Sequence, residues 1–185
     1  MKLDLNSYSL NYSQKILDHL QTLNLKEFKK FLNKLIEIKK KKKNKILLLG
    51  NGGSAAMASH VSVDLTKQCG IRAINFNEAD LITCYGNDYG YENWMKEAIK
   101  KYYDKGDIVV LISSSGNSKN HVIAGNYCKK NKISLVTFTG FNGKNKLSKL
   151  GGINFYLNSQ NFNQIEMVHH IWLLMACDFL TKEKF

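Results

Sequence analysis

The sequence contains no proline and a single arginine, Arg72, although its formal net charge is +12. Nearly all of the positive charge is therefore lysine, and the run Lys39–Lys43 is interpreted as a solvated helix end, where cations suit the helix dipole. Arginine is the residue that base readout and stacking favour, so its scarcity argues against a nucleic-acid partner. The missing proline, with abundant asparagine and isoleucine, is typical of drift in an AT-rich coding sequence.

Long hydrophobic runs and paired cysteines are also missing. No window holds 18 consecutive apolar residues, so no membrane span and no membrane partner are expected, and Met1–Leu10 lacks the apolar segment of a signal peptide. The cysteines form no CxxC pair, which predicts free buried thiols and a cytoplasmic location; they are Cys69, Cys84, Cys128 and Cys177. A chain of 185 residues is expected to form one domain, residues 1–185.

The most informative stretch is Ile46–Leu65, ILLLGNGGSAAMASHVSVDL. Its four leading apolar residues, bounded by glycine, predict a buried parallel strand over Ile46–Leu49. A glycine turn follows, and Ser54 is expected to cap the next helix. Strand, glycine turn and helix N-terminus form an anion site, so we interpret this loop as a phosphate cradle, although a turn that only packs helix on sheet remains an alternative. Its predicted ligand contacts are Asn51, Gly52, Gly53 and Ser54.

A second loop repeats this pattern after the strand predicted over Asp107–Ile112. The segment SSSGNSKN follows that strand and precedes a helix expected over about Asn120–Lys130. Hydroxyl and N–H groups both donate to phosphate oxygens, so this loop is also predicted to bind phosphate, through Ser113, Ser114, Ser115 and Ser118. His121, at the start of the helix, is interpreted as structural.

Strands and helices alternate along the rest of the chain, which predicts a parallel sheet with ligands beyond the carboxyl ends of its strands. Further strands are expected over 72–76, 134–139 and 153–157, and further helices over 79–85, 92–103, 145–150 and 163–180. A polar turn at 86–88 is expected to bring Asn87 and Asp88 to the ligand. The domain then comprises N-terminal helices (1–44), an α/β core (45–160) and a C-terminal helix (161–185).

Two amphipathic helices are expected within residues 5–40, and the C-terminal helix is strongly apolar. Together they carry more apolar surface than one side of a five-stranded sheet needs. This surplus predicts a homo-oligomer, a dimer or a tetramer, closed by two-fold symmetry.

Taken in order, the segments GNGGSAAMASH, YGNDYGYE, ISSSGNS and EMVHH resemble the sugar isomerase (SIS) domain family, above all its phosphoheptose isomerases. The resemblance implies an α/β, flavodoxin-like three-layer sandwich with a five-stranded parallel sheet. It implies an aldose–ketose isomerase that converts sedoheptulose 7-phosphate to D-glycero-D-manno-heptose 7-phosphate for lipopolysaccharide or capsule heptose. It also implies a homotetramer or homodimer with active sites near subunit interfaces.

The same resemblance implies roles for two residues of the helix that follows the glycine turn. His60 matches the family's metal-binding histidine and Asp64 its catalytic glutamate, and their spacing of four places them on one helical face. Asp64 is the candidate base and His169 or His170 the candidate acid for proton transfer next to a carbonyl. A divalent ion such as zinc, on His60, Asp64 and Glu166, would polarise that carbonyl.

The C-terminal helix departs from the family pattern, because Glu166 takes the place of a glutamine and Leu174 that of a second histidine. Glu166 is therefore a second candidate base, and a non-catalytic SIS module that binds a sugar phosphate or a protein partner stays open. A dinucleotide fingerprint, Gly50-x-Gly52-x-x-Ala55, would need an acidic residue at the end of the second strand. Only Glu78 lies just beyond that strand, so no nucleotide cofactor is expected.

Overall fold

The computed structural model describes residues 4–182, so the ends of the predicted N-terminal and C-terminal segments, 1–3 and 183–185, lie outside the described residues. Five parallel strands form one sheet in the order β2-β1-β3-β4-β5. Their bounds are β1 (Ile46–Gly50), β2 (Ala73–Asn75), β3 (Ile108–Ser113), β4 (Ser134–Thr139) and β5 (Ile153–Tyr156). This is the flavodoxin-like strand order, which confirms the predicted fold class.

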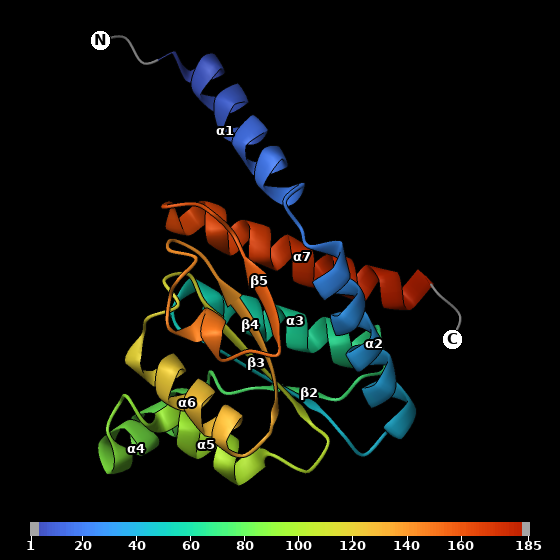
Figure 1. Ribbon diagram of the computed structural model, residues 1–185, viewed down its shortest axis with the longest axis vertical. Helices are drawn as coiled ribbons and strands as arrows, with labels where there is room; N and C mark the ends of the chain where they lie inside the picture. The colour runs from blue at the N-terminus through green and yellow to red at the C-terminus, as the bar shows by residue number, and fades with distance from the viewer. Residues whose placement is uncertain (1–3, 183–185) are drawn as a thin grey trace.

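Helices cover both faces of the sheet and complete three layers (Figure 1). One face is covered by α2 (Leu25–Lys41), α3 (Gly53–Lys67) and α7 (Phe162–Lys182). The other is covered by α4 (Ala79–Tyr89), α5 (Trp94–Tyr102), α6 (Lys119–Lys130) and a 3₁₀ turn, η1 (Leu147–Lys149). Every residue of β1 and β3 is buried, because both sheet faces are covered.

The first helix, α1 (Leu5–Leu20), projects away from this sandwich (Figure 1). It begins at Asp4, whose carboxylate accepts the N–H groups of Asn6 and Ser7, and it has no buried residue. Leu5 and Leu10 are 70% and 72% exposed. The end of the helix contacts α7, where the Trp172 indole donates to the Leu20 carbonyl at 3.3 Å. An apolar helix face thus stands uncovered in the single chain.

Three details of the predicted elements are wrong. The turn at 86–88 lies inside α4, because Gly86 is tolerated within the helix and Gly90, with φ of +81°, ends it instead. Ser54 does not cap α3: Gly52, with φ of +54°, is the cap, and Ser54 lies in the first helical turn. The helix expected over 145–150 is only the turn η1.

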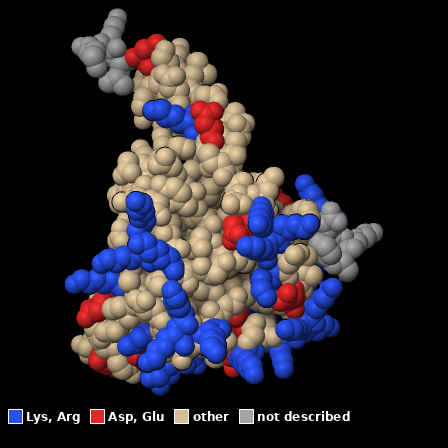
Figure 2. Space-filling view, in the orientation of Figure 1, with Lys and Arg blue, Asp and Glu red and all other residues tan. Residues whose placement is uncertain are grey.

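Lysines spread over the lower half of the face shown in Figure 2. The last turns of α2, α5 and α6 carry Lys39–Lys41, Lys100 with Lys101, and Lys129 with Lys130. The ends of α2, α5 and α6 lead directly into β1, β3 and β4, so they lie at the edge of the sheet where the strands begin. Within residues 4–182, no helix is both long and apolar enough to cross a membrane.

The start of β1 is tied to the start of β3 by a buried ion pair. Lys45 Nζ lies 2.6 Å from Asp107 Oδ2, and the two side chains are 5% and 0% exposed. The Asp107 carboxylate also accepts the N–H groups of Lys45 and Asp104, both at 2.9 Å. Burial alone would raise the pKa of Asp107, but these donors outweigh it and lower that pKa.

Replacing Asp107 is therefore expected to destabilise the sheet. Asp107→Ala leaves the buried Lys45 ammonium with only the 75% exposed Asp104 carboxylate, 2.6 Å away, and leaves the N–H groups that Asp107 accepts unpaired. The free energy of unfolding in urea should therefore fall by ~2–4 kcal/mol at pH 7, somewhat less than for a fully uncompensated buried charge. The lowered pKa means that the carboxylate stabilises the fold above pH ~4, and the contribution is lost at more acidic pH. Glu37→Ala, which breaks the exposed Lys34–Glu37 pair, is the control and should cost less than ~0.5 kcal/mol. An equally small loss for Asp107→Ala would contradict this account.

Candidate active site

A pocket of ≈ 100 Å³ opens where β1 and β3 end, between the N-termini of α3 and α6. We call it the phosphate pocket, and it is lined by Asn51, Ser54, Ile112, Ser113, Ser114, Ser115, Ser118, His121, Phe162 and Glu166. It is well below the ~300–1,000 Å³ of pockets that enclose a drug-sized ligand. Such a pocket suits one small group, with the rest of the ligand outside it.

The first loop reaches the pocket through a backbone that only glycine allows. A Cβ on Gly50 would lie 2.5 Å from the backbone carbonyl of Ser54, so the strand and the helix touch at this turn. The Ser54 side chain is 3% exposed and lies in the first turn of α3. The N–H groups at this end of the helix, with its positive dipole end, favour an anion.

Serine side chains of the second loop form hydrogen bonds with the backbone of that loop. Ser113 Oγ accepts the N–H of Gly116, and Ser115 Oγ accepts the N–H of Asn117, both at 3.2 Å. Because each hydroxyl oxygen accepts a backbone N–H, its own proton is free to be donated to a ligand. Ser114 Oγ is buried and has no hydrogen-bond partner within the described residues. The loop therefore offers donors from side chains as well as from the start of α6.

The pocket contains no lysine or arginine among its described lining residues, and its one acidic side chain is Glu166. Glu166 lies directly over Gly53, since a Cβ on that glycine would overlap the carboxylate. Burial raises the pKa of Glu166. The attraction for an anion thus comes from hydroxyls and helix N-termini rather than from side-chain cations.

A second cluster lies further along α3. His60 Nε2 is 3.5 Å from Asp64 Oδ2, and the His60 ring meets the His170 ring edge-on with centroids 4.8 Å apart. We call these three residues the histidine cluster. Burial lowers the pKa of His170, and the adjacent His60 lowers it further, while Asp64 opposes them. His60 is six residues beyond Ser54, so the cluster begins ~9 Å from the pocket along the helix axis.

The structure does not bring the three predicted metal ligands together. Glu166 lies at the first residue of α3, whereas Asp64 lies near its end. In the part of the chain that the structure describes, no group of three His, Cys, Asp or Glu residues could hold a metal ion. The residues present in one chain therefore do not fit zinc, and we derive no step through a metal.

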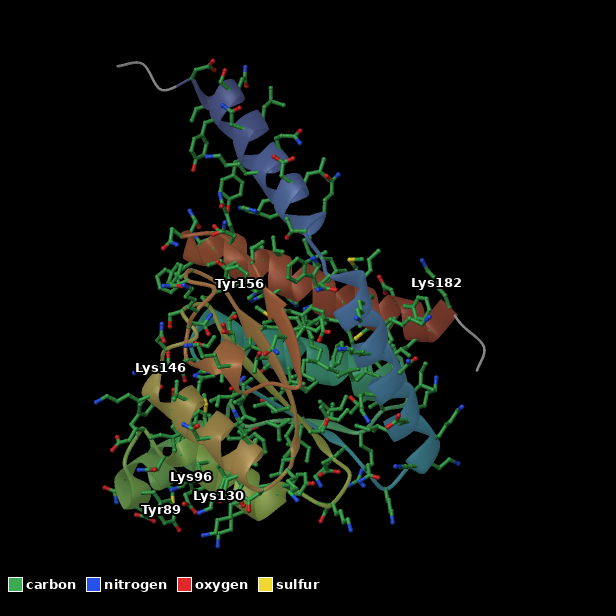
Figure 3. The ribbon with its side chains drawn as sticks, viewed as in Figure 1. Tyr89, Lys96, Lys130, Lys146, Tyr156 and Lys182 are labelled. Atoms are coloured by element: carbon green, nitrogen blue, oxygen red, sulfur yellow. The ribbon has the colours of Figure 1, made fainter. Side chains whose placement is uncertain are left out.

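Other predicted site residues lie away from the pocket. His169 is fully buried, with its ring edge-on to Phe138 at 5.5 Å and tilted against Trp172 at 5.7 Å. Asn87 and Asp88 are exposed on α4 and do not line the phosphate pocket. Tyr156, at the carboxyl end of β5, and Lys130, at the end of α6, lie far apart in Figure 3.

Sequence reasoning missed two contributors at the start of α6. His121 was expected to be structural, yet it lines the pocket, and Asn120, one residue earlier, is bonded to Asn51. The signal was the position of both residues directly after SSSGNSK, where the first helical turn must face the same pocket as the loop.

The cysteines are free thiols, as predicted. Three of them are buried, as predicted. Cys84 is exposed, because it lies on α4, a helix that has no buried residue among those described.

The fold is a doubly wound α/β domain in which the N-termini of α3 and α6 meet at one edge of the sheet. This chain belongs to the SIS domain family, whose pattern matches residues 10–140. The phosphoheptose isomerase of Sulfurimonas denitrificans is 31% identical to it over 171 residues, 86% of this chain and 87% of that protein.

Solved structures show the same fold. The phosphoheptose isomerase of Francisella tularensis superposes with a TM-score of 0.84 at 22% identity, covering 97% of both chains. That of Neisseria gonorrhoeae gives a TM-score of 0.82 at 24% identity, covering 94% of this chain and 96% of the other. Family membership and fold thus agree along almost the whole chain.

The two most deeply buried histidines should make the protein acid-sensitive. Burial lowers the pKa of His121 to about 4 and that of His169 to about 3. Below pH ~6.5 these two histidines bind protons in the unfolded chain but stay neutral in the folded chain. The free energy of unfolding should therefore fall by up to ~1.4 kcal/mol per pH unit for each histidine. The loss should continue down to those lowered values.

Urea unfolding between pH 7 and pH 5 measures this slope. His169→Phe should flatten it, because one titrating group is gone. Trp172→Phe disturbs the same core without removing a titrating group and should lower stability equally at each pH. An unchanged slope in His169→Phe would show that the ring is not held neutral.

Proposed function

We propose that this chain is a sugar-phosphate isomerase acting on sedoheptulose 7-phosphate to give D-glycero-D-manno-heptose 7-phosphate. One observation carries the proposal: Ser54 from one loop and four serines from another line a single small pocket at two helix N-termini. The similar proteins from Sulfurimonas denitrificans and Aliarcobacter butzleri are named phosphoheptose isomerases, which supports a seven-carbon substrate.

The phosphate group is proposed to bind in the phosphate pocket. Hydroxyls of Ser54, Ser115 and Ser118 and the N-termini of α3 and α6 supply neutral donors for its oxygens. The small volume leaves the sugar carbons outside the pocket, along the exposed side of α3. The ~9 Å of helix between Ser54 and His60 is comparable to an extended heptose chain. The carbonyl end would then lie at the histidine cluster.

Isomerisation moves a proton between the two carbons at that end. In the proposal, Asp64 removes the proton from C1 of the ketose and returns it to C2 of the enediol. In this proposal His60, 3.5 Å from Asp64, and His170, edge-on to His60, exchange protons with the two sugar oxygens. Glu166 is the alternative base: it has a raised pKa and lines the pocket itself, so it would serve a sugar bound with its carbonyl end, rather than its phosphate, in the pocket. His169 takes no part, since it is enclosed in the core.

A non-catalytic sugar-phosphate-binding module is the second candidate. It is favoured by Leu174, which stands where the family has a second histidine and packs against the apolar core. Zinc is not part of either proposal, because His60, Asp64 and Glu166 do not converge within one chain.

A homo-oligomer is also proposed, built on the uncovered face of α1 and the neighbouring side of α7. That side exposes Met167, Ile171 and Met175 at 48%, 36% and 43%. A second copy packed on this face would also cover the His60 side chain, which is 52% exposed, and would shield the histidine cluster from solvent. We also propose a cytoplasmic location, which the three buried free thiols support because they fit a reducing compartment.

The phosphate pocket can be tested by its serines. Ser115→Ala should weaken binding of sedoheptulose 7-phosphate by ~1–3 kcal/mol in calorimetric titration, because a hydrogen bond to a charged oxygen is lost. Ser54→Ala with Ser115→Ala should weaken it further. Ser134→Ala, at the start of β4 and so at the opposite end of the strands, is the control and should bind as the wild type does. Unchanged affinity in the double variant would exclude this pocket.

The enzyme and binding-module candidates differ in turnover. Asp64→Asn should keep sugar-phosphate affinity but lose proton exchange between sedoheptulose 7-phosphate and deuterated water by ~10²-fold or more. Asp64→Glu, which restores the family's residue, should keep or raise exchange. Normal proton exchange in Asp64→Asn would show that Asp64 is not the base and would make Glu166 the next candidate. A wild type that binds the sugar phosphate without exchange would identify a binding module.

The oligomer predicts a mass well above that of one chain. Sedimentation of the full chain at micromolar concentration should give a dimer or a tetramer of the 21.1 kDa subunit. Leu10→Lys and Met167→Lys place charges on the uncovered face and should shift the equilibrium toward the monomer. A wild type that sediments only as a monomer would refute the assembly.

A further inference from the structure

Two asparagine side chains connect the two loops of the phosphate pocket. Asn51 follows β1 in the first loop, and Asn120 is the second residue of α6, after the serine loop. Asn120 Nδ2 donates to Asn51 Oδ1 at 3.1 Å, and Asn51 Nδ2 donates to Asn120 Oδ1 at 3.2 Å. The two amides therefore form a reciprocal pair between segments about seventy residues apart.

The pair occupies most of the hydrogen-bonding capacity of Asn51. Its Oδ1 also accepts the hydroxyl of Tyr91 at 3.3 Å, so both lone pairs of that oxygen are engaged. One proton of its Nδ2 remains for a ligand in the pocket. Asn51 thus acts mainly as a link, and its partner Asn120, which is 2% exposed, does not line the pocket at all.

His121 is attached to the same pair. The Oδ1 atom of Asn120 accepts the His121 N–H at 3.0 Å and lies 3.1 Å from His121 Nδ1. The ring is 1% exposed, lines the pocket and has no hydrogen-bond partner at Nε2 within residues 4–182. Its burial, and its place at the positive end of α6, both disfavour a charged imidazolium.

We propose that Asn120 is a positioning residue of the phosphate pocket: its amide pair with Asn51 sets the separation of the glycine loop and the serine loop and holds the His121 ring as a pocket wall. This inference rests on the proposed function only in that the pocket binds a phosphate group. A phosphate that takes donors from both loops depends on their separation, since functional groups must be held within ~0.5 Å of their productive positions.

Calorimetric titration of the full chain with inorganic phosphate tests the proposal. Asn120→Ala should lower phosphate affinity by ~10-fold, and in turnover of sedoheptulose 7-phosphate it should raise KM similarly while kcat changes by less than ~3-fold. Asn131→Ala is the matched control, because that exposed amide at the end of α6 binds only its own helix, at Tyr127 O. Asn120→Ala affinity within ~2-fold of the wild type would overturn the proposal.

A double-variant cycle separates the pair from two independent effects. Asn51→Ala together with Asn120→Ala should bind phosphate no more weakly than the weaker single variant, because either change breaks the same link. Losses that multiply would overturn the proposal.

Side-chain amide exchange by NMR covers the case in which Asn120→Ala does not fold. In the wild type, the Asn120 Nδ2 protons should exchange with solvent far more slowly than those of Asn131, and Asn51→Ala should accelerate them. Equal exchange rates at Asn120 and Asn131 in the wild type would overturn the proposal. Because the first readout is phosphate binding, a wild type without turnover removes the isomerase proposal alone, whereas one that binds no phosphate removes both.

Discussion

The site depends on one constraint, the common direction of the strands. Parallel strands joined by helices bring every crossover helix back to start at the same edge of the sheet. Here that edge gathers the N-termini of α3 and α6, which follow the neighbouring strands β1 and β3. Two helix dipoles and two sets of free N–H groups then face one pocket, and a site without side-chain cations can still attract an anion.

This arrangement could be predicted because its signals are local. An apolar run that ends in glycine or serine predicts a strand and a loop at the carboxyl end of that strand. The bounds of β1, β3 and β4 agree closely with those predicted from such runs. The first loop and the second loop were assigned from the residues that directly follow those runs. Their meeting in one pocket required only the topology, in which β1 and β3 pair in register from Ile46 and Ile108.

The remaining features depend on packing between distant helices, which local patterns do not encode. Whether Glu166 joins His60 or lies over Gly53 is decided by how α7 crosses α3. His169 and His170 are adjacent, and only the helix rotation sends one into the core against Phe138 and the other toward His60. Gly86 has the residue type of a turn but stays helical because the chain has a better stopping point at Gly90.

The lysine-rich helix ends have a consequence for handling the protein. They lie at the edge of the sheet opposite the phosphate pocket and supply much of the surplus positive charge. A negatively charged support should therefore hold the molecule by that edge, with the pocket facing the liquid. Adsorption on a cation exchanger would then orient the chains rather than scatter them, and salt would release them as the charges are screened.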